Sequence, residues 1–432
     1  MRQMKDSEIE WVGEIPQDWV VKKAFQMFCE VKKRNVGMLE DNLLSLSYGK
    51  IKRKDVNGTD GLLPESFEGY NVVEKDDIVL RLTDLQNDHK SLRVGLCKER
   101  GIITSAYVTL RNKSDNFPLF LALQLHAFDV AKGFYGMGGG VRQSLNWEGL
   151  KNHLLVIPSF VEQKNISEYL DEKCTEIDNA IAKTTASIEE YKKLKQAIIT
   201  KAVTKGIRGN RPMKDSGIEW IGEMPADWEL IPFRRVLRER QEKNCPVKSK
   251  ERLSLSIDLG VTLYSEKTTN LDRFKDDFEQ YKLAHKGDLV MNSMNMIVGA
   301  SGVSDYYGCV SPVYYTYYDN EVDHCTAKFC EYIFRSKTLL RVLYSLGKGI
   351  YAIVRGNDRV NTCRLKVSKE DLKSLKLPIP SLTEQREIIA YINDKSNVID
   401  EIIAKKQQLI SELEAYKKSL IYEYVTGKKE VV

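Results

Sequence analysis

The chain has 432 residues, of which 42% are hydrophobic and 29% charged, the composition of a globular protein with room for two to four domains. No apolar run reaches the roughly 18–20 residues that a membrane-spanning helix needs, and the charged first residues do not have the pattern of a secretory signal. The net charge of +5 is too small to identify a nucleic-acid-binding protein without a local basic patch. The eight cysteines form no Cys-x-x-Cys pair, which predicts reduced thiols in a cytoplasmic protein and no zinc site.

The first element in chain order is a phrase that occurs twice. Residues 4–19 read MKDSEIEWVGEIPQDW and residues 213–228 read MKDSGIEWIGEMPADW, identical at twelve of sixteen positions. A second match runs from residue 145 to 206 and returns at a constant offset of 222 from 367 to 428. Because the opening phrase repeats at an offset of 209, the stretch between the matched blocks is 13 residues longer in the second copy. The chain is therefore an internal duplication, predicted to have approximate two-fold symmetry.

Between the matched blocks lie two variable regions, residues 20–144 and 229–366. Both alternate short apolar runs with turn signals and contain a helical stretch, which predicts two mixed α+β domains. KDDIVL (75–80) and KGDLVM (286–291) are echoes of each other and predict strands of one common fold. A duplicated frame with rewritten inserts is typical of a protein that reads two different targets.

Basic clusters such as KIKRK (50–54) and FRRVLRER (233–240) occur in both variable regions. Lysine and arginine neutralise phosphates, and Arg, Asn and Gln read base edges. A single charge run is usually a solvated surface, but clusters in both halves of a duplicated chain favour DNA binding. The glycine-rich stretch 133–144 lacks the end of a P-loop and predicts a flexible loop close to a ligand. From residue type and position, the candidate DNA contacts are Lys50, Lys52, Arg53, Lys54, Arg81, Arg93, Arg142, Gln143, Lys267, Asn292, Asn295, Lys348, Tyr351, Arg355 and Asn357.

Each matched tail is predicted to be one long helix. Ser159 and Glu162, like Ser381 and Glu384, have the spacing of a capping box, and neither tail contains an internal glycine or proline after it. About 39 residues per helix would give a length of about 58 Å. Apolar residues recur at spacings of three and four. The predicted seam comprises Leu170, Ile177, Ile181, Ile188, Tyr191, Ile198, Ile392, Ile399, Ile403, Ile410, Leu413 and Leu420.

The two seams predict that the helices pair as a coiled coil; packing of each helix on its own neighbouring domain is the alternative. If the paired helices run antiparallel, the two variable regions lie at opposite ends of the pair and are kept apart. Four seam positions, Thr184, Lys195, Lys406 and Lys417, are not apolar, so we expect the seam to set the register more than the stability. The expected boundaries are residues 1–150 for the first domain, 151–205 for the central helix, 206–372 for the second domain with a linker at 204–214, and 373–432 for the C-terminal helix.

No catalytic pattern is evident in the sequence. The five histidines are scattered without a metal-ligand pair, and no Gly-x-Ser-x-Gly elbow occurs. SPVY (311–314) differs at Val313 from the motif of amino-methyltransferases, and we interpret it as a chance match. Two hypotheses compete with a DNA-recognition subunit: a modification enzyme with an unseen active site, and a coiled-coil scaffold without DNA binding. Cofactor binding by the isolated chain would favour the enzyme.

The lead-in phrases, together with IPSFVEQ and IPSLTEQ before the long helices and VTKG or VTGK at their ends, resemble the specificity subunits of Type I restriction-modification systems. The resemblance covers essentially the whole chain, and the duplicated Pro-x-x-x-Glu-Gln before a long helix is its specific part. It implies two target-recognition domains that each bind half of a bipartite DNA sequence, and an antiparallel helix pair that sets the gap and docks methyltransferase subunits.

The resemblance also implies a chain that has no catalytic activity and binds no cofactor or metal. Its partners would be double-stranded DNA, two methyltransferase subunits that modify adenine N6 with S-adenosylmethionine, and translocase-nuclease subunits that use ATP and Mg2+. A variant of this hypothesis is a recognition subunit whose partner fuses the methyltransferase and the nuclease. The resemblance implies a cytoplasmic complex without a membrane partner.

Overall fold

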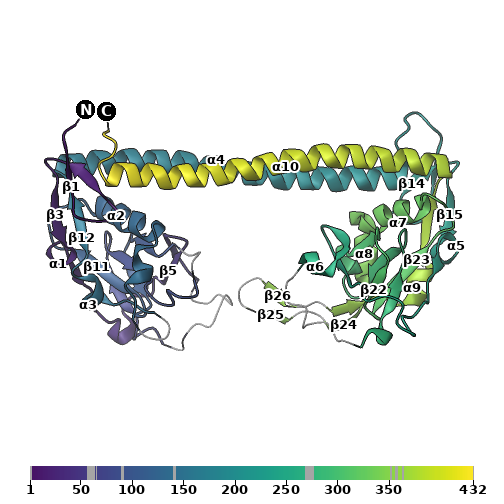
Figure 1. The fold of residues 1–432 in the computed structure, drawn as a ribbon, viewed down its shortest axis with the longest axis horizontal. Coiled ribbons are helices and arrows are strands. Elements are labelled where there is room, and N and C mark those ends of the chain that lie inside the picture. Colours follow the sequence, from purple (N-terminus) through teal and green to yellow (C-terminus); the bar gives the residue numbers. More distant parts are fainter. Residues whose placement is uncertain are drawn as a thin grey trace. The chain divides into compact units, whose positions relative to one another are not determined.

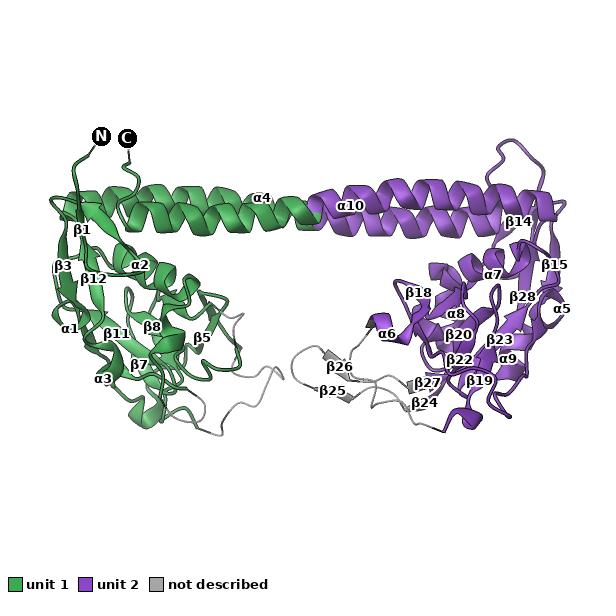
Figure 2. Ribbon diagram, viewed as in Figure 1, with its two compact units in different colours: residues 1–185, 355–358, 407–432 green, residues 186–354, 359–406 purple. Residues whose placement is uncertain are grey.

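The computed structural model describes residues 2–55, 64, 66–88, 92–139, 143–267, 277–350, 353–355, 359–361 and 364–431. The chain divides into two compact units of mixed helix and strand, which confirms the α+β fold class (Figure 2). Unit 1 is built mainly from Met1–Thr185 and Gln407–Val432, and unit 2 from Ala186–Val354 and Arg359–Lys406. Each unit therefore contains a part of both long helices.

Unit 1 is organised around a four-stranded antiparallel sheet in the order β4-β11-β8-β9 (Figure 1). Helix α2 (Pro118–Val130) begins with proline, which suits a first helical position, and buries Phe120 and Leu125 in the core of the unit. The other elements of unit 1 are β1 (Met4–Asp6), β2 (Glu14–Pro16), β3 (Val20–Lys23), α1 (Ala24–Met27), β4 (Phe28–Glu30), η1 (Val36–Met38), β5 (Leu44–Ser47), β6 (Lys50–Arg53), β7 (Asn71–Val73), β8 (Ile78–Leu80), β9 (Val94–Leu96), β10 (Gly101–Ile103), β11 (Val108–Asn112), η2 (Gly133–Gly136), α3 (Trp147–Leu150) and β12 (Leu154–Ile157).

Unit 2 repeats this plan with a sheet in the order β16-β23-β20-β21. Helix α7 (Cys325–Arg335) takes the place of α2 and buries Phe329 and Ile333. The other elements of unit 2 are β13 (Met213–Asp215), β14 (Glu223–Pro225), β15 (Glu229–Pro232), α5 (Phe233–Val236), β16 (Arg238–Glu239), β17 (Leu253–Ser256), β18 (Gly260–Leu263), α6 (Tyr264–Lys267), η4 (Phe278–Gln280), β19 (Lys282–Ala284), β20 (Leu289–Asn292), η5 (Met296–Val298), β21 (Ser301–Val303), β22 (Gly308–Val310), β23 (Tyr314–Tyr318), α8 (Lys337–Leu346), β24 (Lys348–Ile350), β25 (Ile353–Arg355), β26 (Arg359–Asn361), β27 (Arg364–Lys366), α9 (Lys369–Ser374) and β28 (Lys376–Ile379).

The similar stretches KDDIVL and KGDLVM each place a buried aspartate directly before a central strand, which is β8 in unit 1 and β20 in unit 2. Asp77 is 1% exposed and pairs with both ends of the Arg111 guanidinium at 2.6 and 2.8 Å. Asp288, also 1% exposed, pairs with Arg240 at 2.5 and 2.9 Å. The Asp77 carboxylate raises the pKa of Arg111 by its hydrogen bond, which outweighs partial burial. Both units therefore pair a buried aspartate before the equivalent central strand with an arginine, although Arg111 lies on β11 and Arg240 follows β16, the counterpart of β4.

The 13 extra residues of the second copy lie after α7, the helix that corresponds to α2; we call α2 and α7 the domain helices. Trp19 stacks edge-on against Phe120, and Trp228 stacks in the same way against Phe329, so the offset of 209 still holds in these helices. Strands β12 and β28 are already related by the offset of 222. Helix α8 and strand β24 lie in the lengthened segment; the described residues of the corresponding segment in unit 1 contain the short η2.

The two matched tails form the helices α4 (Phe160–Lys205, 46 residues) and α10 (Leu382–Val425, 44 residues). Both are longer than the predicted 39 residues, because the helix runs unbroken from the capping serine to a glycine. Gly206 and Gly427 both have φ +72°, a left-handed conformation that ends a helix without the strain that a Cβ would add.

The helices pair antiparallel within each unit, as predicted. In unit 1 the start of α4 meets the end of α10: the rings of Tyr169 and Tyr424 lie 4.8 Å apart. In unit 2 the end of α4 and the start of α10 share one core cluster, which includes Val203 and Ile392. The same clusters contain domain residues, so packing on the neighbouring domain, the alternative to pairing, also occurs.

Two of the lysines that interrupt the seam bind the opposite helix. Lys195 pairs with Asp400 at 2.7 Å, and Lys417 pairs with Asp178 at 2.6 Å. The two bridges are related by the offset of 222 residues, so each unit has one at the equivalent place. Such a matched pair of contacts favours one register, in agreement with the expected role of the seam.

Most predicted seam residues are in the helix interface. Ile198 is half-buried, and the next residue, Ile199, is buried in the core of unit 2. Of the others, the buried ones are Leu170, Ile177, Ile188, Ile392, Ile399 and Leu420, and the half-buried ones are Ile181, Tyr191, Ile403, Ile410 and Leu413.

Candidate nucleic-acid interface

Each long helix begins at a cluster of four side chains that we call a junction. In junction 1, Glu162 accepts hydrogen bonds from the Arg2 guanidinium and, at 3.1 Å, from the indole N–H of Trp19. Arg2 also binds Asp18 at 2.7 Å. Trp19 and Asp18 of the repeated lead-in phrase, together with Arg2 just before it, thus hold the first turn of the helix.

Junction 2 has the same geometry at the start of α10. Trp228 donates its indole N–H to Glu384 at 3.1 Å, and the Arg211 guanidinium contacts Glu384 and, at 2.5 Å, Asp227. The hydrogen bond with Glu384 is the main reason that the pKa of Arg211 is raised. Junction 2 is better buried than junction 1: the side chain of Glu384 is 2% exposed, that of Glu162 21%.

The capping-box prediction is half right. Ser159 Oγ accepts from the amide of Glu162 at 3.3 Å, and Ser381 Oγ accepts from the amide of Glu384 at 3.4 Å, as expected for a helix cap. The glutamates do not bond back toward the serine amides in the way of a capping box. Their carboxylates bind an arginine and a tryptophan instead, because these stronger partners lie beside the helix start.

The glutamine after each junction glutamate fastens the domain helix. Gln163 donates to the carbonyl of Pro158 at 3.0 Å and accepts from the amide of Phe117, the cap residue of α2, at 2.8 Å. Gln385 donates to the carbonyl of Pro380 at 3.0 Å, and Cys325, the first residue of α7, donates weakly to it. The Glu-Gln pair of the motif therefore joins lead-in, long helix and domain helix.

The glycine that ends one helix packs on the junction at the start of the other. A Cβ on Gly427 would lie 2.4 Å from Pro16 and 3.2 Å from Trp19 of junction 1. A Cβ on Gly206 would lie 3.1 Å from Glu384 of junction 2. Each domain is thereby held between the start of one helix and the end of the other, and its surface loops have a fixed support.

In unit 1, four candidate DNA contacts lie together on strand β6 and at its end. Lys52 is exposed and Lys54 is half-buried. Lys50 is exposed but pairs with Asp178 of α4 at 2.8 Å, and Arg53 pairs with Glu99 at 2.7 Å. Strand β6 therefore presents basic side chains at the surface, two of them held by carboxylates.

Arg93 was predicted to contact DNA, but it lies in the interior of unit 1. It is fully buried, and its guanidinium donates to the carbonyl oxygens of Arg81, Thr83, Asp84 and Asp88 at 2.6–3.3 Å. Such a set of bonds closes the loop after β8 and leaves no face of the side chain for DNA, so we remove it from the candidate contacts. Arg81 is half-buried in the same loop, 3.5 Å from Asp88. Gln143 is half-buried with φ 42°, and Arg142 lies outside the described residues.

In unit 2 the candidates are less complete. Asn292 and the exposed Asn295 share one turn after β20, joined by a backbone hydrogen bond of 3.0 Å. Lys348 of β24 is exposed, 3.6 Å from Asp371. The side chain of Lys267 at the end of α6 and that of Arg355 in β25 lie outside the described part of the structure, as do Tyr351 and Asn357 altogether. The role of all these residues in DNA contact stays a prediction.

Sequence reasoning missed Arg2 and Arg211 because the repeated phrase was read from Met4 onward. The signal was present: the two arginines are related by the same offset of 209 as the phrase itself. Within the described residues, no group of three His, Cys, Asp or Glu side chains is placed to hold a metal ion. None of the helices described here combines the length and apolar character needed to cross a bilayer.

Comparisons with known proteins give consistent matches. Residues 241–414 match the family described as "Type I restriction modification DNA specificity domain". A curated relative from Methanocaldococcus jannaschii, the "Putative type I restriction enzyme MjaX specificity subunit", is 23% identical, with 97% of this chain and 96% of the relative aligned. The MjaVIII specificity subunit of the same organism is 26% identical over 52% of this chain, and the match spans half of that relative's length.

Among solved structures, a chain from work on the "structural basis underlying complex assembly and conformational transition of the type I R-M system" has a TM-score of 0.65 at 12% identity. The match covers 96% of this chain and 99% of the other, so the fold is shared over its length. The HsdS subunit from Thermoanaerobacter tengcongensis matches with a TM-score of 0.48 at 13% identity, covering 96% and 98% of the two chains.

Proposed function

We propose that this chain is a specificity subunit of a Type I restriction-modification system and recognises a DNA sequence in two parts, one read by the domain of each unit; the family match, the curated relatives and the shared fold support this. One observation carries this proposal: the two domains share the contacts that hold them on the long helices, but they differ in the residues that they present at the surface. Both domains have the same junction, the same sheet order and a buried aspartate at the equivalent place that pairs with an arginine. Hairpin β5-β6 presents Lys50, Lys52 and Arg53, whereas the equivalent strand β18 reads Gly-Val-Thr-Leu and has no charge.

The helix pair is proposed to set the gap between the two half-sequences and to dock two methyltransferase subunits. In this proposal the chain itself is not catalytic, binds no cofactor and works in the cytoplasm. S-adenosylmethionine would be used by the methyltransferases for adenine N6, and ATP with Mg2+ by translocase-nuclease subunits. The variant in which one partner fuses methyltransferase and nuclease is compatible with the same features.

A map of methylated adenines in cells that express this chain with its partner methyltransferase tests the proposal. We expect one split motif, with two fixed half-sequences and a gap of constant length. A continuous motif, or no motif under active expression, would contradict it. The map from cells that express the methyltransferase without this chain is the control and should be empty.

A further inference from the structure

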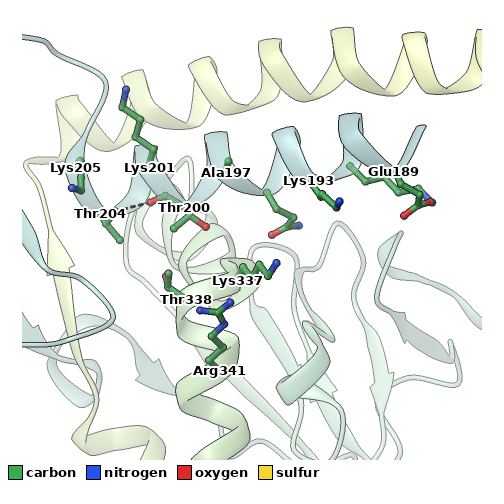
Figure 3. A pocket seen from close by; sticks show the side chains of 12 residues that line it. Glu189, Lys193, Ala197, Thr200, Lys201, Thr204, Lys205, Lys337, Thr338 and Arg341 are labelled. Carbon is green, nitrogen blue, oxygen red and sulfur yellow. Dashed lines mark hydrogen bonds and ion pairs between the residues drawn. The ribbon is translucent and has the colours of Figure 1, made fainter. Parts of the chain in front are cut away.

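The second half of α4 and the start of α8 enclose a groove in unit 2, with a cavity volume of about 800 Å3 (Figure 3). Six basic side chains line it against one carboxylate, that of Glu189. Lys337 and Arg341 of α8 point toward α4, while Lys201 points away from α8 toward α10 (Figure 3). None of the candidate DNA contacts found from the sequence lies in this groove.

Four of the six basic side chains that line the groove have no ion-pair partner among the described residues: Lys201 and Lys205 of α4, and Lys337 and Arg341 of α8. Lys192 and Lys193 of α4 pair with Glu189 and Glu190, both at 2.8 Å. Lys337 and Arg341 are exposed, and neither has an ion-pair partner among the described residues. Two exposed cations without an ion-pair partner attract an anion to the groove beside them. Because the cations are exposed, they lose little hydration when the anion binds.

The N-terminus of α8 adds to this charge. The helix has ten residues, and its cap residue Ser336 donates its hydroxyl back to the carbonyl of Ile333 at 2.7 Å, so no side chain caps the first turn. Uncapped amides and the helix dipole favour a phosphate at such an end. In the same groove the hydroxyl groups of Thr200 and Thr338, which can donate to an anion, have no hydrogen-bond partner among the described residues.

We propose that this groove binds the phosphodiester backbone of the DNA, a sequence-independent contact that rests on the proposed function. The groove lining runs along α4 from Glu189 to Lys205, about 24 Å at 1.5 Å per residue. A single small anion spans a fraction of that length, whereas consecutive phosphates of one strand recur about every 3.4 Å along the duplex. Helix N-termini with lysine and arginine are common phosphate contacts in DNA complexes.

Among the described residues, the helix α8 that forms this contact has no helix of similar length at the corresponding place in unit 1. Helix α8 lies in the segment that is 13 residues longer in the second copy, and unit 1 has η2 at that place. The backbone contact should therefore strengthen binding without changing either half of the recognised sequence.

The test is the double variant Lys337→Ala/Arg341→Ala in the assembled complex with its methyltransferase subunits. DNA affinity is measured against salt, on a duplex with the mapped motif and on one without it. We expect the slope of log K against log salt to fall by about 0.9 per lost phosphate contact, and both duplexes to bind about fivefold more weakly per contact, with the motif unchanged. The variant Lys337→Arg/Arg341→Lys keeps both charges and should bind almost as the wild type does.

The matched control is Lys250→Ala/Lys286→Ala, which removes two exposed lysines of unit 2 outside the groove. If Lys337→Ala/Arg341→Ala has the salt slope of this control, the groove does not bind DNA and the proposal is wrong. A variant that fails to assemble, while its remaining assembled fraction keeps the wild-type slope, would identify the groove as a protein-docking surface and also overturn it. Failure of the proposed function shows separately, as a wild-type complex without any split motif.

Discussion

At the scale of the residue, Glu384 joins the Arg211 guanidinium and the Trp228 indole to the start of helix α10. Its carboxylate is 2% exposed and accepts from the Arg211 guanidinium and the Trp228 indole. Glu384→Ala leaves both donors buried without this acceptor, and we expect a loss of about 2–4 kcal/mol in the free energy of unfolding. Glu162→Ala should lose less, about 1–2 kcal/mol, because junction 1 is more open to water.

Thermal and urea unfolding of the full chain measure both losses. Glu412→Ala is the control, since Glu412 is an exposed residue of α10 whose side chain accepts a hydrogen bond from Gln408 of the same helix at 2.8 Å. Equal unfolding of Glu384→Ala and Glu412→Ala would show that the junction does not stabilise the fold.

Asp129 should make the free energy of unfolding depend on pH. It is 2% exposed on α2, accepts from the amide of Arg93 at 2.6 Å, and burial raises its pKa from 3.8 to about 6 in spite of the nearby Arg93 and Lys132 cations. Because the unfolded chain ionises this group first as pH rises, its protonated form stabilises the fold at pH 4, and this contribution is lost between about pH 4 and 6. The loss is up to about 3 kcal/mol.

Asp129→Asn cannot ionise and should therefore be more stable than the wild type at pH 7.5, with the advantage vanishing toward pH 4. The measurement is the urea midpoint at both pH values. Asp41→Asn, at an exposed position, should show no such difference. The interpretation is wrong if the two substitutions have parallel pH profiles.

At the scale of the element, the glycines that end the long helices allow a graded test. Gly217, Gly206 and Gly427 all have positive φ, but a Cβ meets nothing within 4 Å at Gly217, contacts of 3.1–3.3 Å at Gly206, and Pro16 at 2.4 Å at Gly427. Alanine at Gly217 should cost about 1 kcal/mol of backbone strain only. We expect Gly206→Ala to cost more and Gly427→Ala the most, as measured by unfolding midpoints. Any other order would mean that the helix ends do not pack on the junctions.

The elements also show what the sequence could reveal. Both long helices and their apolar stripes were predicted, because an amphipathic helix leaves a period that can be read locally. Their antiparallel direction was implied by the family resemblance, since a local period does not contain it. The strand order was not predicted, since pairs such as Phe28 with Asn112 depend on distant segments. Arg93 was misjudged because residue type does not distinguish an arginine at the surface from one that closes a loop. The groove between α4 and α8 could not be predicted from a sequence motif, because its cations come from two elements far apart in the chain.

At the scale of the whole molecule, the internal duplication predicts two independent readers. Replacing residues 20–144 with the corresponding region of another specificity subunit keeps Trp19, Glu162 and Gly427, so junction 1 can still form. We expect one half of the methylated motif to change, and the other half and the gap to stay as they were. A new sequence in both halves would contradict separate reading by the two domains.

The helix pair makes the gap itself testable. Helix α4 passes from unit 1 into unit 2 at Thr185, and α10 passes back at Lys406, so three heptads inserted at both points leave Lys195–Asp400 and Lys417–Asp178 within their own units. Twenty-one residues add about 31 Å at 1.5 Å per residue while keeping the seam in register. That length is close to one turn of DNA, so both half-sites can still present the same face.

We expect the methylated motif of this variant to keep both half-sequences and to gain about nine or ten base pairs in its gap. One inserted heptad adds about three base pairs and rotates the second half-site away from its domain, so methylation should weaken strongly. Three heptads in α4 alone break the matched ion pairs and should abolish the motif. The decisive result is the gap of the doubly extended variant: if its methylation map has the wild-type gap, the helices do not set the spacing.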